Sequence, residues 1–199
     1  MKMNTLQEKL ELSCWIAKTF FNRGMGSGTS GNFSFLHEGH LYITGSNTCF
    51  GMLKPEQFAK LDLSGNICNA VKPSKEWPLH LAAYENNPQT GAVIHIHSTY
   101  ATLWSCLPHA EEADCVPDYT PYLKMKLGTV GLIPYAKPGS EALLQAFRNR
   151  MAFSDGWLLA NHGLVTPGKT IMDAFSACEE LEAACRIAWE LRGVDTRKI

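Results

Sequence analysis

Two histidines on one predicted strand are the most chemically informative residues of this chain. The segment Val93-Ile94-His95-Ile96-His97 is typical of a β-strand. Because side chains at positions i and i+2 point to the same face of a strand, His95 and His97 share one face, while Ile94 and Ile96 are buried on the other. Two neutral imidazoles side by side can bind one cation, whereas two protonated ones would repel each other. A metal site and a pair of surface histidines on an edge strand are both compatible with this pattern.

A third histidine, His162, comes at the end of a predicted strand and stands between Asn161 and Gly163. A side chain in that position can reach into a cleft. Catalytic metals commonly take three protein ligands and leave one position open for substrate, so His162 is the candidate third ligand. Taken as a single residue, it would more often be an ordinary loop histidine. No role is assigned to the four remaining histidines, which are His37, His40, His80 and His109.

Glu76 begins a predicted helix over residues 76–86. A glutamate in the first turn commonly interacts with the positive end of the helix. Its functional alternative is a general acid/base beside the metal, or a fourth ligand when substrate is absent. Ser74 can cap this helix, and Pro78 is tolerated because it falls in the first turn. His80 lies one helical turn after Glu76, and we expect it on the helix surface.

Three short segments rich in glycine and hydroxyl side chains could bind an oxyanion. Gly28-Thr29-Ser30-Gly31-Asn32 offers backbone N–H groups with little steric obstruction. It matches neither the P-loop pattern nor the dinucleotide fingerprint. Thr44-Gly45-Ser46 follows a predicted strand, and Ser74-Lys75 comes just before Glu76. Each segment could be a simple turn, but three of them in one chain favour an anion site.

Helices and strands that alternate along the chain must position these residues. Helices are predicted from residue 6 to a stop at Gly24, and over 76–86, 99–107, 140–151 and 170–191, with Ser140 as a cap. Strands are predicted over 33–36, 40–44, 58–63, 67–70, 92–96, 129–134, 156–160 and 164–166, and loops over 24–32 and 108–122. Turn-length connections between neighbouring strands favour an α/β sandwich with a largely antiparallel sheet over a doubly wound parallel sheet.

The composition excludes several classes of protein. A chain of 199 residues fits a single domain, 1–199, and 45% hydrophobic with 19% charged residues is ordinary for a soluble enzyme. The net charge of −1, without a basic stripe, argues against nucleic-acid binding. No apolar run of ~18 residues could span a membrane, and the N-terminus lacks the apolar core of a secretory signal. Seven cysteines without a Cys-x-x-Cys motif indicate reduced thiols in a cytoplasmic protein.

In their order and spacing, these motifs resemble the class II aldolase/adducin family. The family pattern is Gly-Thr-x-Gly-Asn, Thr-Gly, Ser-x-Glu, His-x-His and a late His-Gly, and the resemblance runs over nearly the whole chain. It implies a three-layer α/β/α sandwich with a central, largely antiparallel sheet. It also implies a homotetramer with active sites between subunits.

The resemblance further implies one divalent cation per subunit, with Zn²⁺ as the first choice, bound by His95, His97 and His162. Glu76 would transfer protons and could also bind the metal. The residues implied for the substrate phosphate are Thr29, Gly31, Asn32, Thr44, Gly45, Ser74 and Lys75.

Several segments resemble one branch of the family, the 3-oxo-tetronate 4-phosphate decarboxylases. These segments are residues 74–76, 97–102, 105–107, 120–122 and 133–135, the last of them followed by Pro138-Gly139. The fuculose and ribulose phosphate enzymes usually have Ser-Ser-Glu, so Lys75 departs from them. Lys75 would add a positive charge near a phosphate or carboxylate, or would be a solvated lysine at the start of a helix.

The branch implies decarboxylation of a 3-oxo-tetronate 4-phosphate to dihydroxyacetone phosphate and carbon dioxide, through an enediolate stabilised by the metal. Glu76 would handle the proton, assisted by Tyr122 or Tyr119. The alternative is an aldolase that cleaves a ketose 1-phosphate such as fuculose or ribulose phosphate through the same kind of enediolate. A pentose-phosphate 4-epimerase and a non-catalytic adducin-like module are further alternatives. Such a module should have lost metal ligands, and this chain keeps all of them.

Overall fold

Seven strands form one sheet in the computed structural model, which describes residues 5–199. Residues 1–4, which contributed to the predicted domain and to the predicted absence of a secretory signal, lie outside the described residues. The strands are β1 (Asn32–His37), β2 (His40–Thr44), β3 (Phe58–Asp62), β4 (Ala92–Ile96), β5 (Val130–Ile133), β6 (Gly156–Leu159) and β7 (Gly163–Gly168). Their order in the sheet is β3-β2-β1-β4-β7-β6-β5. Only β5 and β6 pair in parallel, which confirms the predicted largely antiparallel sheet.

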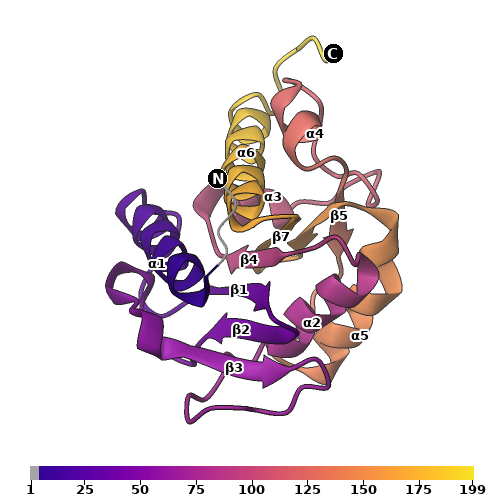
Figure 1. Ribbon diagram of the computed structural model, residues 1–199. Helices are drawn as coiled ribbons and strands as arrows, with labels where there is room; N and C mark the ends of the chain where they lie inside the picture. The colour runs from indigo at the N-terminus through magenta and orange to yellow at the C-terminus, as the bar shows by residue number, and fades with distance from the viewer. Residues whose placement is uncertain (1–4) are drawn as a thin grey trace.

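Helices cover both faces of the sheet, so the three-layer α/β/α sandwich is confirmed (Figure 1). The helices are α1 (Leu6–Asn22), α2 (Trp77–Asn86), α3 (Thr99–Ser105), α4 (Tyr122–Lys126), α5 (Glu141–Arg150) and α6 (Ile171–Glu190). The α1, α3 and α6 helices pack on one face, and α2 and α5 pack on the other. None of the helices in residues 5–199 combines the length and the apolar character that a membrane crossing requires.

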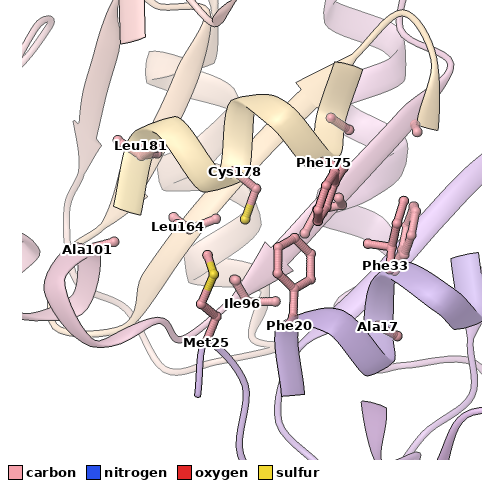
Figure 2. Packing of buried hydrophobic residues seen from close by; sticks show 14 of the residues in the cluster. Ala17, Phe20, Met25, Phe33, Ile96, Ala101, Leu164, Phe175, Cys178 and Leu181 are labelled. Atoms are coloured by element: carbon pink, nitrogen blue, oxygen red, sulfur yellow. The ribbon is translucent and has the colours of Figure 1, made fainter. Parts of the chain in front are cut away.

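The larger core cluster fixes the ends of β1 and β4, where the candidate site begins. The rings of Phe20 and Phe175 lie 5.2 Å apart and join α1 to α6 (Figure 2). Beneath them, Phe33 of β1 and Ile96 of β4 are fully buried. Burial of each such side chain stabilises the fold by about 1.5–3 kcal/mol, so these strand ends are held firmly in place.

The alternation along β4 follows the sequence-based prediction. Ile94 and Ile96 belong to the cluster under α1 and α6, whereas Val93 belongs to the cluster under α2 and α5. His95 is two residues from Val93, so its side chain points to the α2 side of the sheet. The N-terminus of α2 is therefore the element that can meet His95.

The predicted strand over residues 67–70 is wrong. Only an isolated bridge between Leu61 and Ile67 forms there. The side chain of Asn69 takes the place of a paired strand, because it accepts a hydrogen bond from the Lys60 backbone N–H and donates one to the Phe58 backbone oxygen. Side-chain hydrogen bonds thus satisfy the edge of β3 without a continuous ladder.

Two helix starts also differ from the prediction. The N-cap residue of α2 is Glu76 and not Ser74, although the Ser74 hydroxyl accepts a 3.4 Å hydrogen bond from the Glu76 backbone N–H. Residues 122–126 form the short helix α4, which was not predicted and which begins at the last residue of the predicted loop 108–122. Pro121 precedes this helix, a position where the missing proline N–H costs nothing. By contrast, Ser140 caps α5 as predicted, since its side chain accepts from the Leu143 N–H.

Candidate metal centre

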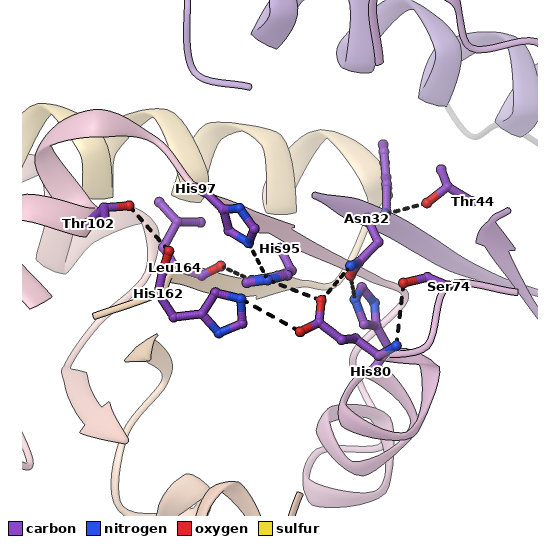
Figure 3. A network of polar contacts seen from close by, with 11 residues as sticks. Asn32, Thr44, Ser74, His80, His95, His97, Thr102, His162 and Leu164 are labelled. Carbon is purple, nitrogen blue, oxygen red and sulfur yellow. Dashed lines mark hydrogen bonds and ion pairs between the residues drawn. The ribbon is translucent and has the colours of Figure 1, made fainter. Parts of the chain in front are cut away.

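Three histidines from two strand ends point toward one another (Figure 3). His95 lies near the end of β4, His97 directly follows that strand, and His162 directly precedes β7. Their potential ligand atoms all lie within 4.8 Å of one another. The Nε2 atoms of His95 and His97 are 3.1 Å apart. Two nitrogens bound tetrahedrally to one zinc at about 2.0–2.1 Å are separated by about 3.3 Å, so this spacing suits a shared cation.

The ring of His95 is oriented by the neighbouring strand β7. Its Nδ1–H donates a 2.8 Å hydrogen bond to the backbone oxygen of Leu164. In a neutral imidazole the other nitrogen then carries a lone pair, so Nε2 is available to a metal. The side chain is fully buried, which leaves this orientation little freedom.

The segment Asn161-His162-Gly163 has a backbone that explains its sequence. Asn161 has φ 55°, a left-handed conformation that asparagine tolerates better than most residues. A Cβ atom at Gly163 would lie 2.4 Å from the Ile96 backbone oxygen and 2.9 Å from Cδ2 of His97. Glycine is therefore required for β7 to pass this close to His97, and the turn before it brings His162 into the cluster.

The carboxylate of Glu76 completes the cluster from the N-terminus of α2. Its Oε2 lies 3.3 Å from Nε2 of His95, and its Oε1 lies 3.6 Å from Nε2 of His162. The side-chain amide of Asn32 donates a 2.8 Å hydrogen bond to Oε2. Glu76 is only 6% exposed, so its charge acts in a poorly hydrated environment.

Burial and neighbouring charges set the protonation of these groups. Burial by itself would raise the pKa of Glu76, but His95, Asn32 and His162 together bring that pKa well below its ordinary value. Burial and then the charge of His95 lower the pKa of His97 to about 3 and that of His162 to about 4. Burial also opposes protonation of His95, but Glu76 raises its pKa on balance. Near pH 7 an ionised Glu76 thus faces neutral His97 and His162, and both states suit a cation.

The donor set fits a divalent cation. Among residues 5–199, three buried side-chain nitrogen or oxygen atoms lack a hydrogen-bond partner, and all three belong to this cluster: Oε1 of Glu76 and both ring nitrogens of His162. Such atoms cost roughly 1–3 kcal/mol each when they stay unpaired. Three imidazoles with one carboxylate are ligands that zinc and similar divalent ions prefer.

The three predicted anion-binding segments converge beside Glu76. The Ser74 backbone N–H donates a 3.1 Å hydrogen bond to the Thr44 backbone oxygen, and the Thr44 hydroxyl accepts one of 3.2 Å from the Phe33 N–H. A Cβ atom at Gly45 would lie 2.8 Å from the Gln57 backbone oxygen, so this close approach requires glycine. The segments therefore form one continuous edge next to the histidine cluster.

Individual residues of these segments differ in their surroundings. Thr29 and Lys75 are exposed, and Gly31 has φ 89° beside the His95 backbone. Asn32 is 3% exposed, and its side chain contacts Glu76 and His80. The Asn32 amide is therefore part of the wall of the metal cluster.

The two candidate tyrosines lie elsewhere in the chain. The hydroxyl of Tyr119 accepts a 3.3 Å hydrogen bond from Thr196 in the C-terminal segment. Tyr122 begins α4 and is 58% exposed. Among residues 5–199, no hydrogen bond joins either tyrosine to Glu76 or to the histidine cluster, and α4 lies close to the C-terminal end of α6 (Figure 1).

His80 lies next to the cluster, since Asn32 bonds to both His80 and Glu76. The expected position on the helix surface is wrong, because His80 is fully buried. One ring nitrogen bonds to Asn32 and the other to Ser34. A signal for this burial existed in the sequence: Glu76, His80 and Tyr84 recur every four residues, so they share one face of the predicted helix.

This arrangement of a sandwich fold with a histidine cluster at the edge of its sheet agrees with the comparison against known families. The model of the class II aldolase and adducin N-terminal domain matches residues 11–189. The chain therefore belongs to the class II aldolase and adducin family, and the resemblance seen in the sequence motifs is confirmed.

Three relatives place the chain within that family. A 3-oxo-tetronate 4-phosphate decarboxylase of Haemophilus influenzae is 37% identical over 196 residues, which cover 98% of this chain and 93% of the relative. The crystal structure of YgbL from Escherichia coli, provisionally described as an aldolase/epimerase/decarboxylase, superposes with a TM-score of 0.93 at 36% identity, covering 98% of this chain and 94% of YgbL. An L-fuculose 1-phosphate aldolase superposes with a TM-score of 0.86 at 26% identity, covering 96% of this chain and 90% of that one.

Proposed function

We propose that this protein is a metal-dependent carbon–carbon lyase that converts a 3-oxo-tetronate 4-phosphate to dihydroxyacetone phosphate and carbon dioxide. The main support for this proposal is one buried cluster, in which the Glu76 carboxylate lies beside His95, His97 and His162. The Haemophilus influenzae relative, which matches nearly the full length of this chain, is named for this reaction. Its higher identity favours decarboxylation over the aldol cleavage named for the fuculose phosphate enzyme.

The proposed cofactor is one divalent cation per chain, with zinc as the first choice. His95, His97 and His162 would hold it, and Glu76 would add a ligand in the absence of substrate. When bound, the cation supplies a Lewis acid that takes up the negative charge developing on the substrate oxygens. The nitrogen-rich donor set and the unpaired atoms of His162 and Glu76 support this assignment.

The proton chemistry is assigned to Glu76. Departure of carbon dioxide breaks the bond between the carboxylate carbon and the neighbouring hydroxyl-bearing carbon, and the electron pair stays on the latter. One proton must then be added to that carbon to form dihydroxyacetone phosphate. Glu76 is ionised near pH 7, so it first takes up one proton from solvent and then delivers it to this carbon, which matches the one proton that the net reaction consumes. Its buried position beside the cluster keeps it within reach of a substrate bound there.

The substrate phosphate is assigned to the continuous edge formed by the three polar segments. The proposed contacts are Thr29, Gly31, Asn32, Thr44, Gly45, Ser74 and Lys75. The hydrogen bond between Ser74 and Thr44 holds two of these segments together beside Glu76, and the exposed Lys75 adds a positive charge. Since the Asn32 side chain already contacts Glu76 and His80, its contact to a phosphate would come from its remaining amide hydrogen or its backbone.

We propose Tyr122, with Tyr119 as the alternative, as an assisting residue that acts in the site of a neighbouring subunit. The exposure of Tyr122, and the lack of a hydrogen bond between either tyrosine and the cluster of the same chain within residues 5–199, support this arrangement. The corresponding assembly is a homotetramer of one-domain subunits with inter-subunit active sites. Light scattering on the purified protein measures its mass against the 22.0 kDa of one chain.

A cytoplasmic location is proposed as well. All seven cysteines are free thiols, and three of them are buried in the core. Free thiols are typical of a reducing compartment.

A comparison of two substrates on one metal-loaded preparation tests the proposed reaction. The decarboxylase predicts release of carbon dioxide and triose phosphate from the 3-oxo acid phosphate, and little cleavage of fuculose 1-phosphate. The opposite preference would identify an aldolase. Inactivity with both substrates, although metal is bound, would leave the pentose-phosphate 4-epimerase or a non-catalytic module and would reject the proposal.

A further inference from the structure

Helix α2 and strand β1 face each other with matching periodicities. Glu76, His80 and Tyr84 follow one another at intervals of four residues, so they lie on one face of the helical segment. Asn32 and Ser34 are two residues apart on β1 and point to the same side of the sheet. All five side chains are buried, with exposures of 0–6%.

These five side chains form one unbroken row of hydrogen bonds. The row runs from Glu76 to Asn32 at 2.8 Å, from Asn32 to His80, from His80 to Ser34 at 2.7 Å and from Ser34 to Tyr84 at 2.8 Å. Figure 3 shows the part of the row nearest the metal cluster, with His80 below Asn32. One end of the row is the Glu76 carboxylate, which belongs to the metal cluster. The residues beyond Asn32 can therefore affect that carboxylate only through the Asn32 amide.

The direction of the first two hydrogen bonds follows from the chemistry of the groups. An ionised carboxylate only accepts, so Asn32 must present its NH₂ group to Glu76. The amide oxygen of Asn32 then faces His80, whose Nε2 must carry a hydrogen to satisfy it. The ring of His80 is fully buried, and its two nitrogens bond to the uncharged side chains of Asn32 and Ser34, so a charged ring would have no counter-ion there. The ring is therefore neutral and carries only this one hydrogen.

The remaining two directions are fixed in turn. Nδ1 of His80 has no hydrogen, so it accepts from the Ser34 hydroxyl. With its hydrogen used in this way, the Ser34 oxygen accepts from Tyr84. Burial raises the pKa of Tyr84 far above its ordinary value, so its hydroxyl keeps the hydrogen that it donates.

We propose that His80 is a positioning residue that fixes the rotation of the Glu76 carboxylate through Asn32. A side-chain amide can turn over and exchange its oxygen for its nitrogen. His80 donates from Nε2, so a turned Asn32 would bring its NH₂ group against the His80 N–H. It would also bring its amide oxygen against the negatively charged carboxylate of Glu76. His80 thereby keeps Oε2 of Glu76 bonded to Asn32. Oε1, which has no hydrogen-bond partner within residues 5–199, is left facing the site.

A role in packing alone does not account for this row. Burial of hydroxyl, imidazole and amide groups costs free energy unless each finds a partner, and apolar side chains would fill the same space at lower cost. The row is satisfied in one direction only, and its direction leads to the carboxylate. In the proposed reaction, Oε1 is then the atom that takes up and transfers the proton, a step that rests on the proposed function.

The first test needs neither substrate nor a variant. Nitrogen-15 NMR of the histidine rings distinguishes the two neutral tautomers. The wild-type protein is expected to show His80 protonated at Nε2 and unprotonated at Nδ1 near pH 7. Protonation at Nδ1, or rapid exchange between the tautomers, would overturn the proposal whether or not the protein is a decarboxylase.

The second test is a matched pair of variants in metal-loaded protein. The amide nitrogen of glutamine occupies the place of Nε2, so His80→Gln keeps the donor to Asn32, whereas the shorter side chain of His80→Asn cannot reach it. We expect His80→Asn to lower kcat about 10–100-fold with KM and metal content nearly unchanged, and His80→Gln to restore kcat to within a few-fold of wild type.

Equal losses of kcat in both variants, or a change in KM alone, would overturn the positioning role. If the wild-type protein releases no carbon dioxide, the proposed reaction fails, and the positioning claim is decided by the tautomer measurement. If His80→Asn does not fold, the tautomer measurement on the wild-type protein decides in the same way.

Discussion

The Nδ1–H of His95 donates to the backbone oxygen of Leu164 at 2.8 Å, and this hydrogen bond crosses from β4 to β7. The two strands that carry the metal cluster are thus joined through one of its ligands. The register places Leu164 opposite Ile96, the residue that stands between His95 and His97 in the sequence. The pairing of β4 with β7 therefore brings His162 to His95 and His97, which are more than 60 residues away along the chain.

The histidine cluster is expected to determine metal content. His95→Gln, His97→Gln and His162→Gln each remove an imidazole ligand, so each should lower bound metal well below one ion per chain after dialysis. His40→Gln is the matched control, because His40 lies at the opposite end of β2 from Thr44. Elemental analysis of the four variants measures the effect. Full metal content in the three cluster variants would show that the histidines do not hold the ion.

Gly163→Ala should disturb both the fold and the metal site. The new methyl group would meet the Ile96 backbone and the ring of His97 at distances that no packed structure tolerates. We expect a loss of about 1–3 kcal/mol in the free energy of unfolding and a weaker affinity for metal. Gly26→Ala is the control, since its methyl group would meet only Phe50 at 3.8 Å, an ordinary contact. Urea unfolding and metal titration on both variants check the pair, and equal behaviour would contradict it.

Glu182 holds the segment that follows His97. Its carboxylate accepts hydrogen bonds from the Ser98 hydroxyl at 2.7 Å and from the backbone N–H groups of Tyr100 at 3.0 Å and Ala101 at 2.8 Å. Glu182→Gln should therefore destabilise the fold by about 1–3 kcal/mol, because these bonds lose their charge and one acceptor oxygen.

The same change should also weaken metal binding, since Ser98 is adjacent to His97. Glu180→Gln on the same helix provides the control for the substitution itself. Thermal unfolding and metal titration measure the two effects. Unchanged metal affinity in Glu182→Gln would show that this carboxylate stabilises α3 without positioning the ligand.

The buried His80 makes stability depend on pH. Its pKa in the folded protein is about 3, below the ordinary value of 6.5. As the pH falls below 6.5, His80 binds a proton in the unfolded chain but not in the folded protein. The contribution of His80 to stability is therefore complete above pH 6.5 and is lost as the pH falls toward 3. The loss from one such group approaches about 1.4 kcal/mol per pH unit.

His80→Gln removes this contribution. In the presence of a chelator, the difference in unfolding free energy between wild type and His80→Gln should shrink as the pH falls from 6.5 to 4.5. Urea titrations at several pH values measure that difference. A difference that stays constant over this interval would mean that His80 titrates equally in the folded and unfolded chains.

Local sequence patterns predicted most of the fold. The period-two alternation around His95 correctly assigned Ile94 and Ile96 to one face of the sheet. The helical pattern over residues 170–191 correctly predicted the last helix, which the structure has at Ile171–Glu190. Such patterns are reliable because each depends on residues that are close in sequence.

The features that were missed depend on contacts between distant segments. A strand was predicted over residues 67–70 because the sequence does not show that the Asn69 side chain bonds to β3. His80 was predicted to lie on the surface because its hydrogen-bond partners, Asn32 and Ser34, lie more than 40 residues earlier in the sequence. The approach of His162 to His95 was suggested by the family motif but could not be derived from spacing, since it depends on the pairing of β4 with β7.

Metal-dependent release of carbon dioxide tests the central claim most directly. Metal-loaded protein is incubated with a 3-oxo-tetronate 4-phosphate, and carbon dioxide and dihydroxyacetone phosphate are measured together, with chelated protein as the background for spontaneous loss. The predicted result is formation of the two products in equal amounts, abolished by the chelator and restored by the metal. Equal release with and without metal, or the absence of dihydroxyacetone phosphate, would contradict the claim.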